Sequence, residues 1–172
     1  HNIHFVMVSA QIGGDGRTAI EAAGKLDAAV PVEVVRQFAI MQPIKAAPYA
    51  THAQFSDPAT ILKLPAPPPD LVLVATMYHY ARALAFAIFM DTPSAQAEID
   101  TLTRLERESD FKPFEEWFLP AKEIVQTARL VAQGRLADAK GDLAEAAKAY
   151  DEAVFIEDTL AYMEPPYWYY PI

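Results

Sequence analysis

The sequence contains no cysteine among its 172 residues. Disulfides and thiolate metal sites are therefore excluded, although one missing residue type does not identify a compartment, and localisation stays open. Positive charge is also scarce, because 14 Lys and Arg residues stand against 23 Asp and Glu residues and give a net charge of -9. Without a basic cluster, neither nucleic acid nor an anionic membrane surface is expected as a partner, since both require concentrated positive charge.

The sequence also lacks a recognisable catalytic motif. No nucleophile stands beside a base, and no pair of carboxylates has a catalytic spacing. Residues 13–16 (GGDG) look like a phosphate-binding loop, but the Lys-Ser/Thr that follows such a loop is missing. We therefore expect a protein that is not an enzyme and that holds no metal or cofactor.

One long apolar run, at residues 71–90, has enough length to span a bilayer. His79 and Arg82 would lie near its centre, where a charge costs about 2.5 kcal/mol or more. The composition, with 52% hydrophobic and 22% charged residues, is that of a globular protein. We expect a buried helix without membrane insertion, in which Arg82 meets a carboxylate or the groove because an unpaired buried charge is costly, and pairing with a carboxylate is preferred.

The clearest pattern in the chain is a helical hairpin at residues 127–158. Apolar residues recur at i, i+3 or i+4, and i+7 in both of its halves. Gly141 lies between the halves and can adopt the left-handed conformation that ends a helix. Gly134 allows two helix backbones to approach closely, and Tyr150 is expected to fill the space beside it.

This hairpin resembles the tetratricopeptide repeat, a helix-turn-helix unit of about 34 residues. The matching positions are Gly134, Gly141, Ala146, Tyr150 and Ala153, whereas Leu130, Ala137 and Asp158 replace two aromatic residues and a proline of the pattern. Residues 1–30 and 71–108 repeat the same offsets. The EPPYWYYP run at residues 164–171 is similar to one in a widespread group of bacterial tetratricopeptide-repeat proteins, and HNIHF and YHYARA also resemble that group.

The resemblance implies an all-α fold in which tetratricopeptide-type hairpins stack into a right-handed α-α superhelix. We expect residues 1–172 to form a single domain that belongs to a longer repeat array. Residues 159–172 are expected to begin a further repeat. The expected helical pairs cover about residues 1–30, 33–64, 71–108 and 121–158, the second of them degenerate because prolines interrupt it.

In tetratricopeptide proteins the first helix of each pair lines a concave groove, so the resemblance implies that the functional residues lie on those helices. The expected groove residues are His1, His4, Gln11, Tyr80, Arg135, Asp138, Trp168 and Tyr169. Of these, Trp168 and Tyr169 are expected to open the next helix and close the end of the groove.

The two histidines of this set stand three residues apart and could share a helix face, as some metal ligands do. No carboxylate lies beside His1 and His4 in the sequence. Contact with a polar group of a ligand, or ordinary packing, is therefore preferred to metal binding.

The leading hypothesis is a non-catalytic scaffold that binds a protein or peptide partner in the concave groove. The alternative is a small-molecule or metal-binding domain of a larger enzyme or transport system. A third hypothesis is self-association, because an uncapped end of a repeat array exposes apolar surface. Nothing in the sequence identifies the partner.

Overall fold

A computed structural model describes residues 1–164 and 166–172, and the regular elements in these residues are all helices. The all-α expectation is confirmed. The helices are α1 (Asn2–Gly13), α2 (Gly16–Ala29), α3 (Val32–Gln37), α4 (Gln42–Phe55), α5 (Pro58–Ile61), α6 (Val72–Ile88), α7 (Thr92–Glu108), α8 (Lys112–Glu115), α9 (Ala121–Ala139) and α10 (Leu143–Thr159), with a short 3-10 helix η1 (Ala39–Met41) before α4.

Three helical hairpins, α1–α2, α6–α7 and α9–α10, share one turn geometry. In each, a residue with positive φ is followed by an aspartate that caps the second helix. These aspartates accept hydrogen bonds from backbone N–H groups that the start of a helix leaves unpaired. The positive-φ residues are Gly14 (75°), Met90 (59°) and Gly141 (79°), and the capping residues are Asp15, Asp91 and Asp142. The left-handed conformation predicted for Gly141 is confirmed.

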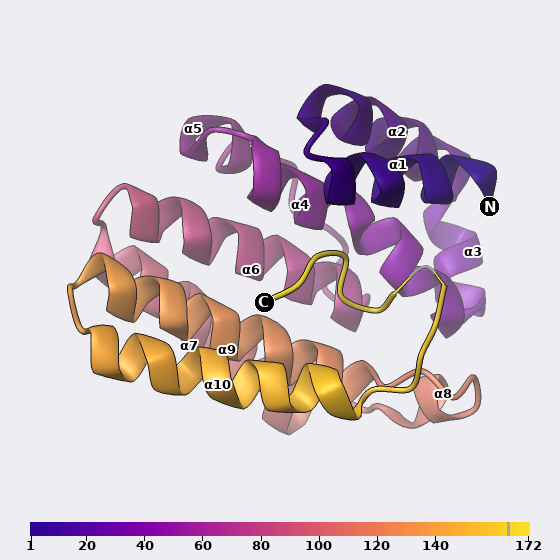
Figure 1. Cartoon of the computed structure of the whole chain (residues 1–172). Coiled ribbons are helices and arrows are strands. Elements are labelled where there is room, and N and C mark those ends of the chain that lie inside the picture. The colour runs from indigo at the N-terminus through magenta and orange to yellow at the C-terminus, as the bar shows by residue number, and fades with distance from the viewer. Residues whose placement is uncertain (165) are drawn as a thin grey trace.

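Helix α4 lies between α1 and α6, and α9 lies on the other side of α6 (Figure 1). Contacts join α1 to α4, α4 to α6, and α6 to α9, and we call these four helices the helix row. Helix α2 packs against α1 and α4, α7 packs against α6 and α9, and α10 packs against α9. The core follows this row, because the largest cluster of buried apolar residues takes side chains from all four helices.

The close approach of α9 and α10 depends on Gly134. A Cβ atom at this position would lie only 2.5 Å from Cε1 of Tyr150, so the tyrosine ring rests directly against the backbone of α9. The sequence prediction that these two residues pack together is confirmed. Ala146 and Ala153, on the facing side of α10, are buried and keep the two helices close.

The expected degenerate pair at residues 33–64 contains three short helices and one longer one. Helix α4 continues through Pro48, whereas α5 has only four residues. Asp57 caps α5 by accepting from the backbone N–H of Thr60 at 3.0 Å. The proline-rich residues 65–69 then separate α5 from α6.

Residues 159–172 differ from the expected start of a further helix. Helix α10 ends at Thr159, and no helix occurs in the described residues that follow. Pro166 and Pro171 leave only four residues between them, too few for a stable helical turn that lacks capping partners. Trp168 and Tyr169 instead become buried against the helix row, each with 6% of its surface exposed. Pro165, which belongs to the residues expected to begin a further repeat, lies outside the described residues.

We expect Gly134→Ala to lower the free energy of unfolding by about 1–3 kcal/mol, because the added methyl group would overlap the Tyr150 ring. Gly24→Ala is the matched control, since Gly24 is an exposed residue of α2 with no atom within 4 Å of an added Cβ. That change should raise stability by about 0.5–1 kcal/mol through helix propensity. Urea denaturation of both variants tests the pair, and equal effects would contradict the close approach.

A second prediction concerns Met90, which has a left-handed backbone that costs an ordinary residue about 1–2 kcal/mol. Its side chain is largely exposed, so little packing is lost with it. Met90→Gly should therefore raise the free energy of unfolding by up to about 1 kcal/mol, after allowance for the greater freedom of the unfolded chain. Gly141→Ala should lower it by a similar amount. Thermal and urea denaturation measure both changes, and a less stable Met90→Gly protein would disagree with this account.

Candidate functional groove

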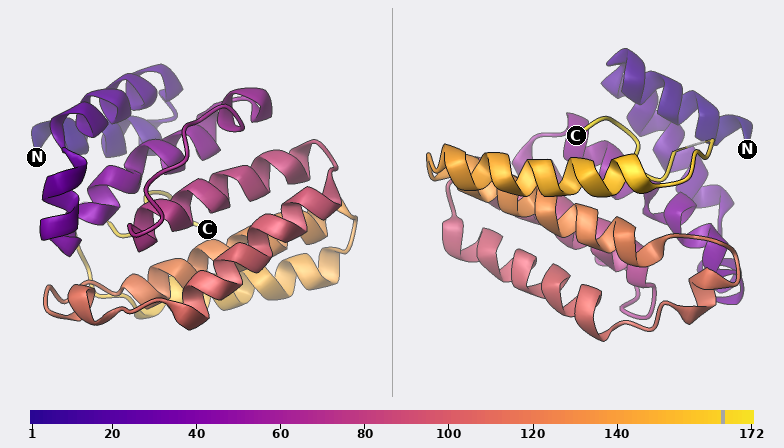
Figure 2. Two further views of the ribbon diagram at one scale, coloured as in Figure 1. Left: turned by 180° about the vertical axis from the view of Figure 1, so that it is seen from behind. Right: turned by 60° about the horizontal axis from the view of Figure 1, so that its bottom comes forward.

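Residues 166–172, here called the aromatic segment, lie across the helix row. Figure 1 shows the chain turning back after α10 and crossing in front of this row. The view from behind in Figure 2 has α7 in front, so the aromatic segment and α7 lie on opposite faces of the row. The face that the segment crosses is the candidate functional groove.

Successive side chains of the segment face different walls of the groove. Tyr169 contacts α1 and α4, through His4 and Pro43. Trp168 and Tyr170 contact α6 through Tyr80. The backbone bends at residues 167–170 and forms no helix. The groove therefore holds a bent, non-helical segment between two walls.

The hydroxyl of Tyr169 connects the segment to the α1 and α4 wall. It donates to the backbone carbonyl of Pro43 at 3.1 Å, and it lies 3.2 Å from Nε2 of His4. Because a hydroxyl has a single proton, it must accept from His4, which assigns the proton of the neutral imidazole to Nε2. The two rings also meet edge to face, with 5.6 Å between their centroids. Both hydrogen-bonding capacities of this hydroxyl are thus used.

Tyr80 anchors the opposite wall and is almost completely buried. Its ring meets the Trp168 indole edge to face, with the centroids 5.3 Å apart. Its hydroxyl lies 2.8 Å from the hydroxyl of Tyr170, so that one of the two donates to the other. Aromatic pairs of this geometry contribute about 0.5–1.5 kcal/mol beyond the burial of their surface. The tyrosine-tryptophan contact is therefore a principal attachment of the segment.

The backbone of the segment contributes little to this attachment. Among the described residues beyond Leu160, no backbone-to-backbone hydrogen bond is formed. The backbone N–H of Ile172 lies 3.5 Å from a carboxylate oxygen of Glu157, at the outer limit for a hydrogen bond. Side chains therefore hold the aromatic segment, whereas each helix is held by its own backbone.

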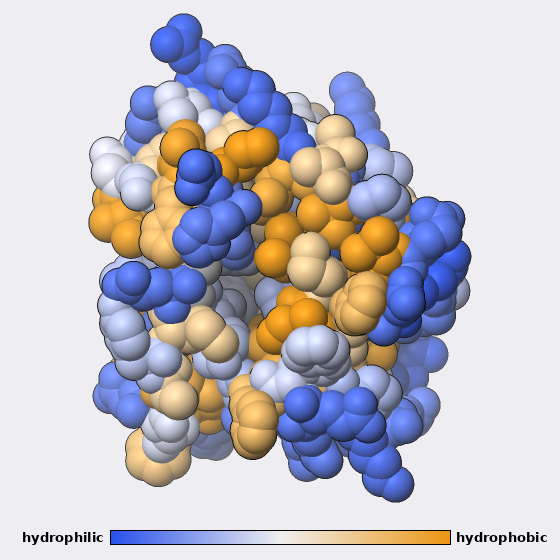
Figure 3. Space-filling view, turned by 90° about the vertical axis from the view of Figure 1, so that its right-hand side faces the viewer, coloured by the Kyte–Doolittle hydropathy of each residue, from blue (hydrophilic) through white to orange (hydrophobic). Residues whose placement is uncertain are grey.

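Two cavities of about 410 Å³ each flank the segment. The α1 cavity lies between the segment, α1, α2 and the start of α4, and its walls are mainly apolar side chains such as Leu26, Met41 and Ile44. Figure 3 shows apolar side chains gathered around a hollow on this side of the molecule. The α9 cavity lies between the segment, α9 and α10, and is lined by apolar and aromatic side chains together with the charged residues Arg135 and Asp138. The segment thus leaves space along both of its edges.

The predicted groove residues are only partly brought together. His4, Tyr80, Trp168 and Tyr169 form the contacts with the segment described above. Arg135 and Asp138 line the α9 cavity and His1 lines the α1 cavity. Gln11 lies elsewhere, because its side-chain amide donates to Gln54 of α4 at 3.0 Å.

Sequence reasoning missed Tyr170 and the Pro43 carbonyl. Tyr170 belongs to the same aromatic run as Trp168 and Tyr169 and could have been included if that run had been interpreted as extended. A backbone carbonyl has no signal in the sequence. Its role as an acceptor depends on the long-range packing of the segment against α4.

Arg82 is held on the other side of α6. Its Nε donates to Glu98 of α7 at 2.7 Å, and Nδ1 of His79 lies 2.6 Å from the same carboxylate. The guanidinium also lies over the rings of Tyr78 and Phe86. The predicted carboxylate partner is confirmed, and Arg82 is a packing residue of the α6–α7 hairpin.

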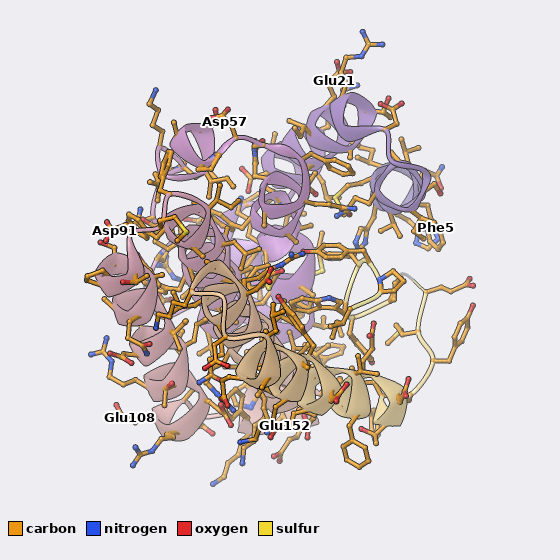
Figure 4. The ribbon with its side chains drawn as sticks, turned by 60° about the vertical axis from the view of Figure 1, so that its left-hand side comes forward. Phe5, Glu21, Asp57, Asp91, Glu108 and Glu152 are labelled. Carbon is orange, nitrogen blue, oxygen red and sulfur yellow. The ribbon has the colours of Figure 1, made fainter. Side chains whose placement is uncertain are left out.

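Many acidic side chains lie on the outside of the molecule, away from the groove. Figure 4 shows Glu21, Asp57, Asp91, Glu108 and Glu152 pointing away from the segment, and all five are exposed. In the described residues, no three His, Asp or Glu side chains gather as a metal site requires. Over the same residues, no helix is long and apolar enough to cross a bilayer.

Burial shifts the protonation equilibria of the groove. It raises the pKa values of Tyr80, Tyr169 and Tyr170 above the ordinary tyrosine value, with hydroxyl contacts and neighbouring charges as smaller influences. These phenols therefore stay neutral at physiological pH. Burial, followed by the positive charge of the amino terminus, lowers the pKa of His4 to about 4. The groove is accordingly an uncharged site at its centre.

Comparisons with known proteins were made by family model, by curated sequence and by solved structure. No family model matches the chain, and no curated protein or solved structure is significantly similar to it. Its function must therefore be inferred from the groove itself.

The lowered pKa of His4 predicts a pH-dependent stability. Neutral His4 is favoured in the fold, so its contribution is complete above pH 6.5, the unfolded value, and is lost as the pH falls through about 4. Between these pH values the free energy of unfolding should fall by at most about 3 kcal/mol. His4→Gln retains an N–H donor for Tyr169 without titrating, and should show a shallower decrease.

Urea denaturation at several pH values between 7 and 4 measures this difference. His52, whose pKa burial also lowers, is present in both proteins, so its contribution cancels in the comparison. Identical pH profiles for the two proteins would show that His4 is not the buried titrating group.

Proposed function

We propose that the chain is a non-catalytic binding module, a tetratricopeptide-type superhelix that holds a peptide of a protein partner in the groove. The observation that carries this proposal is that residues 166–172 of the chain already lie there as a bent, non-helical segment, with side chains that contact different walls. Peptides are commonly recognised through side-chain pockets in a groove. The shared turn geometry of three hairpins supports the repeat architecture.

The chemistry of the groove supports binding rather than catalysis. The phenols have raised pKa values, so they are poor nucleophiles at neutral pH. His4 donates its Nε2 proton to Tyr169 and therefore does not act as a base toward that hydroxyl. Aromatic rings that carry a polar group able to hydrogen-bond are typical of peptide and protein interfaces.

The α1 cavity favours a second candidate, the binding of a small apolar molecule. Its volume of about 410 Å³ falls in the range of ligand pockets, roughly 300–1,000 Å³. Its walls are mainly apolar, and His1 and His4 supply polar groups. This candidate uses one edge of the groove, whereas peptide binding uses the whole length of the segment.

A display library of random twelve-residue peptides, panned against the full chain, tests the proposed function. The selected peptides should bind Arg135→Ala, Asp138→Ala protein at least tenfold more weakly, because these exposed side chains line the groove. Arg104→Ala, Glu108→Ala protein is the matched control. It carries two exposed changes on α7, across the helix row from the segment, and should bind normally.

Selected peptides that distinguish neither double variant from the wild type would place binding outside the groove. The small-molecule candidate is favoured if panning selects nothing while an apolar fluorescent dye binds the wild type. That dye should not bind Ile3→Trp protein, in which a larger side chain fills the α1 cavity.

A further inference from the structure

The side chains that the groove already holds indicate the chemistry of its partner. We propose that the partner is a non-helical peptide with consecutive tyrosine and tryptophan side chains, which binds by displacing the aromatic segment from the groove. This inference rests on the proposed function and adds the class of partner and the way in which binding is regulated. The segment is then both a copy of the ligand and its competitor.

The hydrogen bonds of the groove select tyrosine over other apolar side chains. The Pro43 carbonyl accepts a hydrogen bond and the Nε2–H of His4 needs an acceptor, and one phenol hydroxyl at the Tyr169 position serves both. A phenylalanine there would leave the buried His4 N–H without a partner, at a cost of about 1–3 kcal/mol. On the opposite wall, the Tyr80 hydroxyl likewise requires a partner, which Tyr170 now provides.

The shape of the groove selects a non-helical ligand. Side chains of neighbouring residues contact different walls, which a helix does not achieve with consecutive residues, and the segment bends at residues 167–170. Pro171 restricts Tyr170, the residue before it, to extended conformations. Proline also reduces the conformational entropy that a free peptide loses on binding. A partner with prolines beside its aromatic residues would share this advantage.

Several observations show that the segment can be replaced. It is held by side chains, without backbone-to-backbone hydrogen bonds in its described residues. The indole N–H of Trp168 is buried and has no acceptor among the described residues, so one polar group is poorly satisfied. Cavities of about 410 Å³ on both sides leave room for a longer or larger peptide. Release of the segment would not interrupt any helix.

Trp168 offers a direct measure of displacement. The chain has two tryptophans, and the other, Trp117, is 45% exposed in the turn that follows α8. In a Trp117→Phe protein, Trp168 is the sole tryptophan and reports whether the segment is buried or released. The probe is the tryptophan-free peptide YMEPPYFYYPI, which corresponds to residues 162–172 with Phe in place of Trp168.

We expect this peptide to shift the emission of Trp168 to longer wavelength in a saturable way, as the indole becomes exposed. A tethered segment competes at an effective concentration in the millimolar range, so a high peptide concentration is required for the Trp117→Phe protein. Adding Tyr169→Phe and Tyr170→Phe to that protein weakens the segment without loss of ring volume. The half-saturating peptide concentration should then fall at least tenfold, because the hydrogen bonds of two hydroxyls are lost.

Two control peptides test the recognition chemistry. A peptide with alanine at the positions of residues 168, 169 and 170 should cause no shift of the Trp168 emission. A peptide with phenylalanine in place of its last two tyrosines should require at least a tenfold higher concentration than YMEPPYFYYPI. Circular dichroism of each protein confirms that the variants are folded, and the conservative Tyr→Phe changes keep the rings that fill the groove.

The inference is overturned if the peptide binds, as shown by fluorescence anisotropy of a labelled copy, while Trp168 emission stays constant. It is also overturned if the peptide does not bind the weakened, folded variant. A dimer in sedimentation with Trp168 still buried would identify a second copy of the chain as the occupant, against a separate partner. If panned peptides bind the groove but lack aromatic residues, the proposed function stands and only this inference fails.

Discussion

The structure depends on how the exposed face of the helix row is covered. Helices α1, α6 and α9 each bury one side against the following helix of the same hairpin, and this leaves an apolar side facing outward. Water contact with that side would cost about 25 cal/mol for each Å² of apolar surface. The aromatic segment covers the row at its centre, so that Trp168 and Tyr169 join the main core although they lie far in sequence from its other members.

The two ways of covering apolar surface differ in strength. Hairpin partners combine burial with a complete set of backbone hydrogen bonds, and at Gly134 the backbone of α9 directly contacts the ring of Tyr150. The segment relies on burial and on a few side-chain hydrogen bonds. Regions with few protected backbone hydrogen bonds open at lower free energy than helices packed on both sides. The groove is therefore the part of the core whose cover is most easily exchanged.

Much of the fold could be predicted from local sequence signals. Helical periodicity, the Gly141 turn and small residues such as Gly134 act over a few residues, and each specifies a hairpin without reference to the rest of the chain. The aromatic segment could not be predicted in the same way. Its bent course depends on contacts such as that between His4 and Tyr169, which only the assembled fold creates. Helical spacing also placed Gln11 in the groove. In the structure its side chain packs against α4 instead and donates to Gln54.

The energetics of the segment restrict what could replace it. Releasing Trp168 and Tyr169 exposes two large aromatic side chains, at a cost of about 2–3 kcal/mol each. A ligand must recover that burial and also supply an acceptor for the His4 N–H, which loses the Tyr169 hydroxyl when the segment leaves. An aliphatic peptide recovers part of the burial but leaves this N–H unpaired. A charged peptide loses the solvation of its charges in a groove whose centre is uncharged. Among natural side chains, tyrosine supplies both the ring and the hydroxyl. A competing peptide therefore needs the same two groups that the aromatic segment provides.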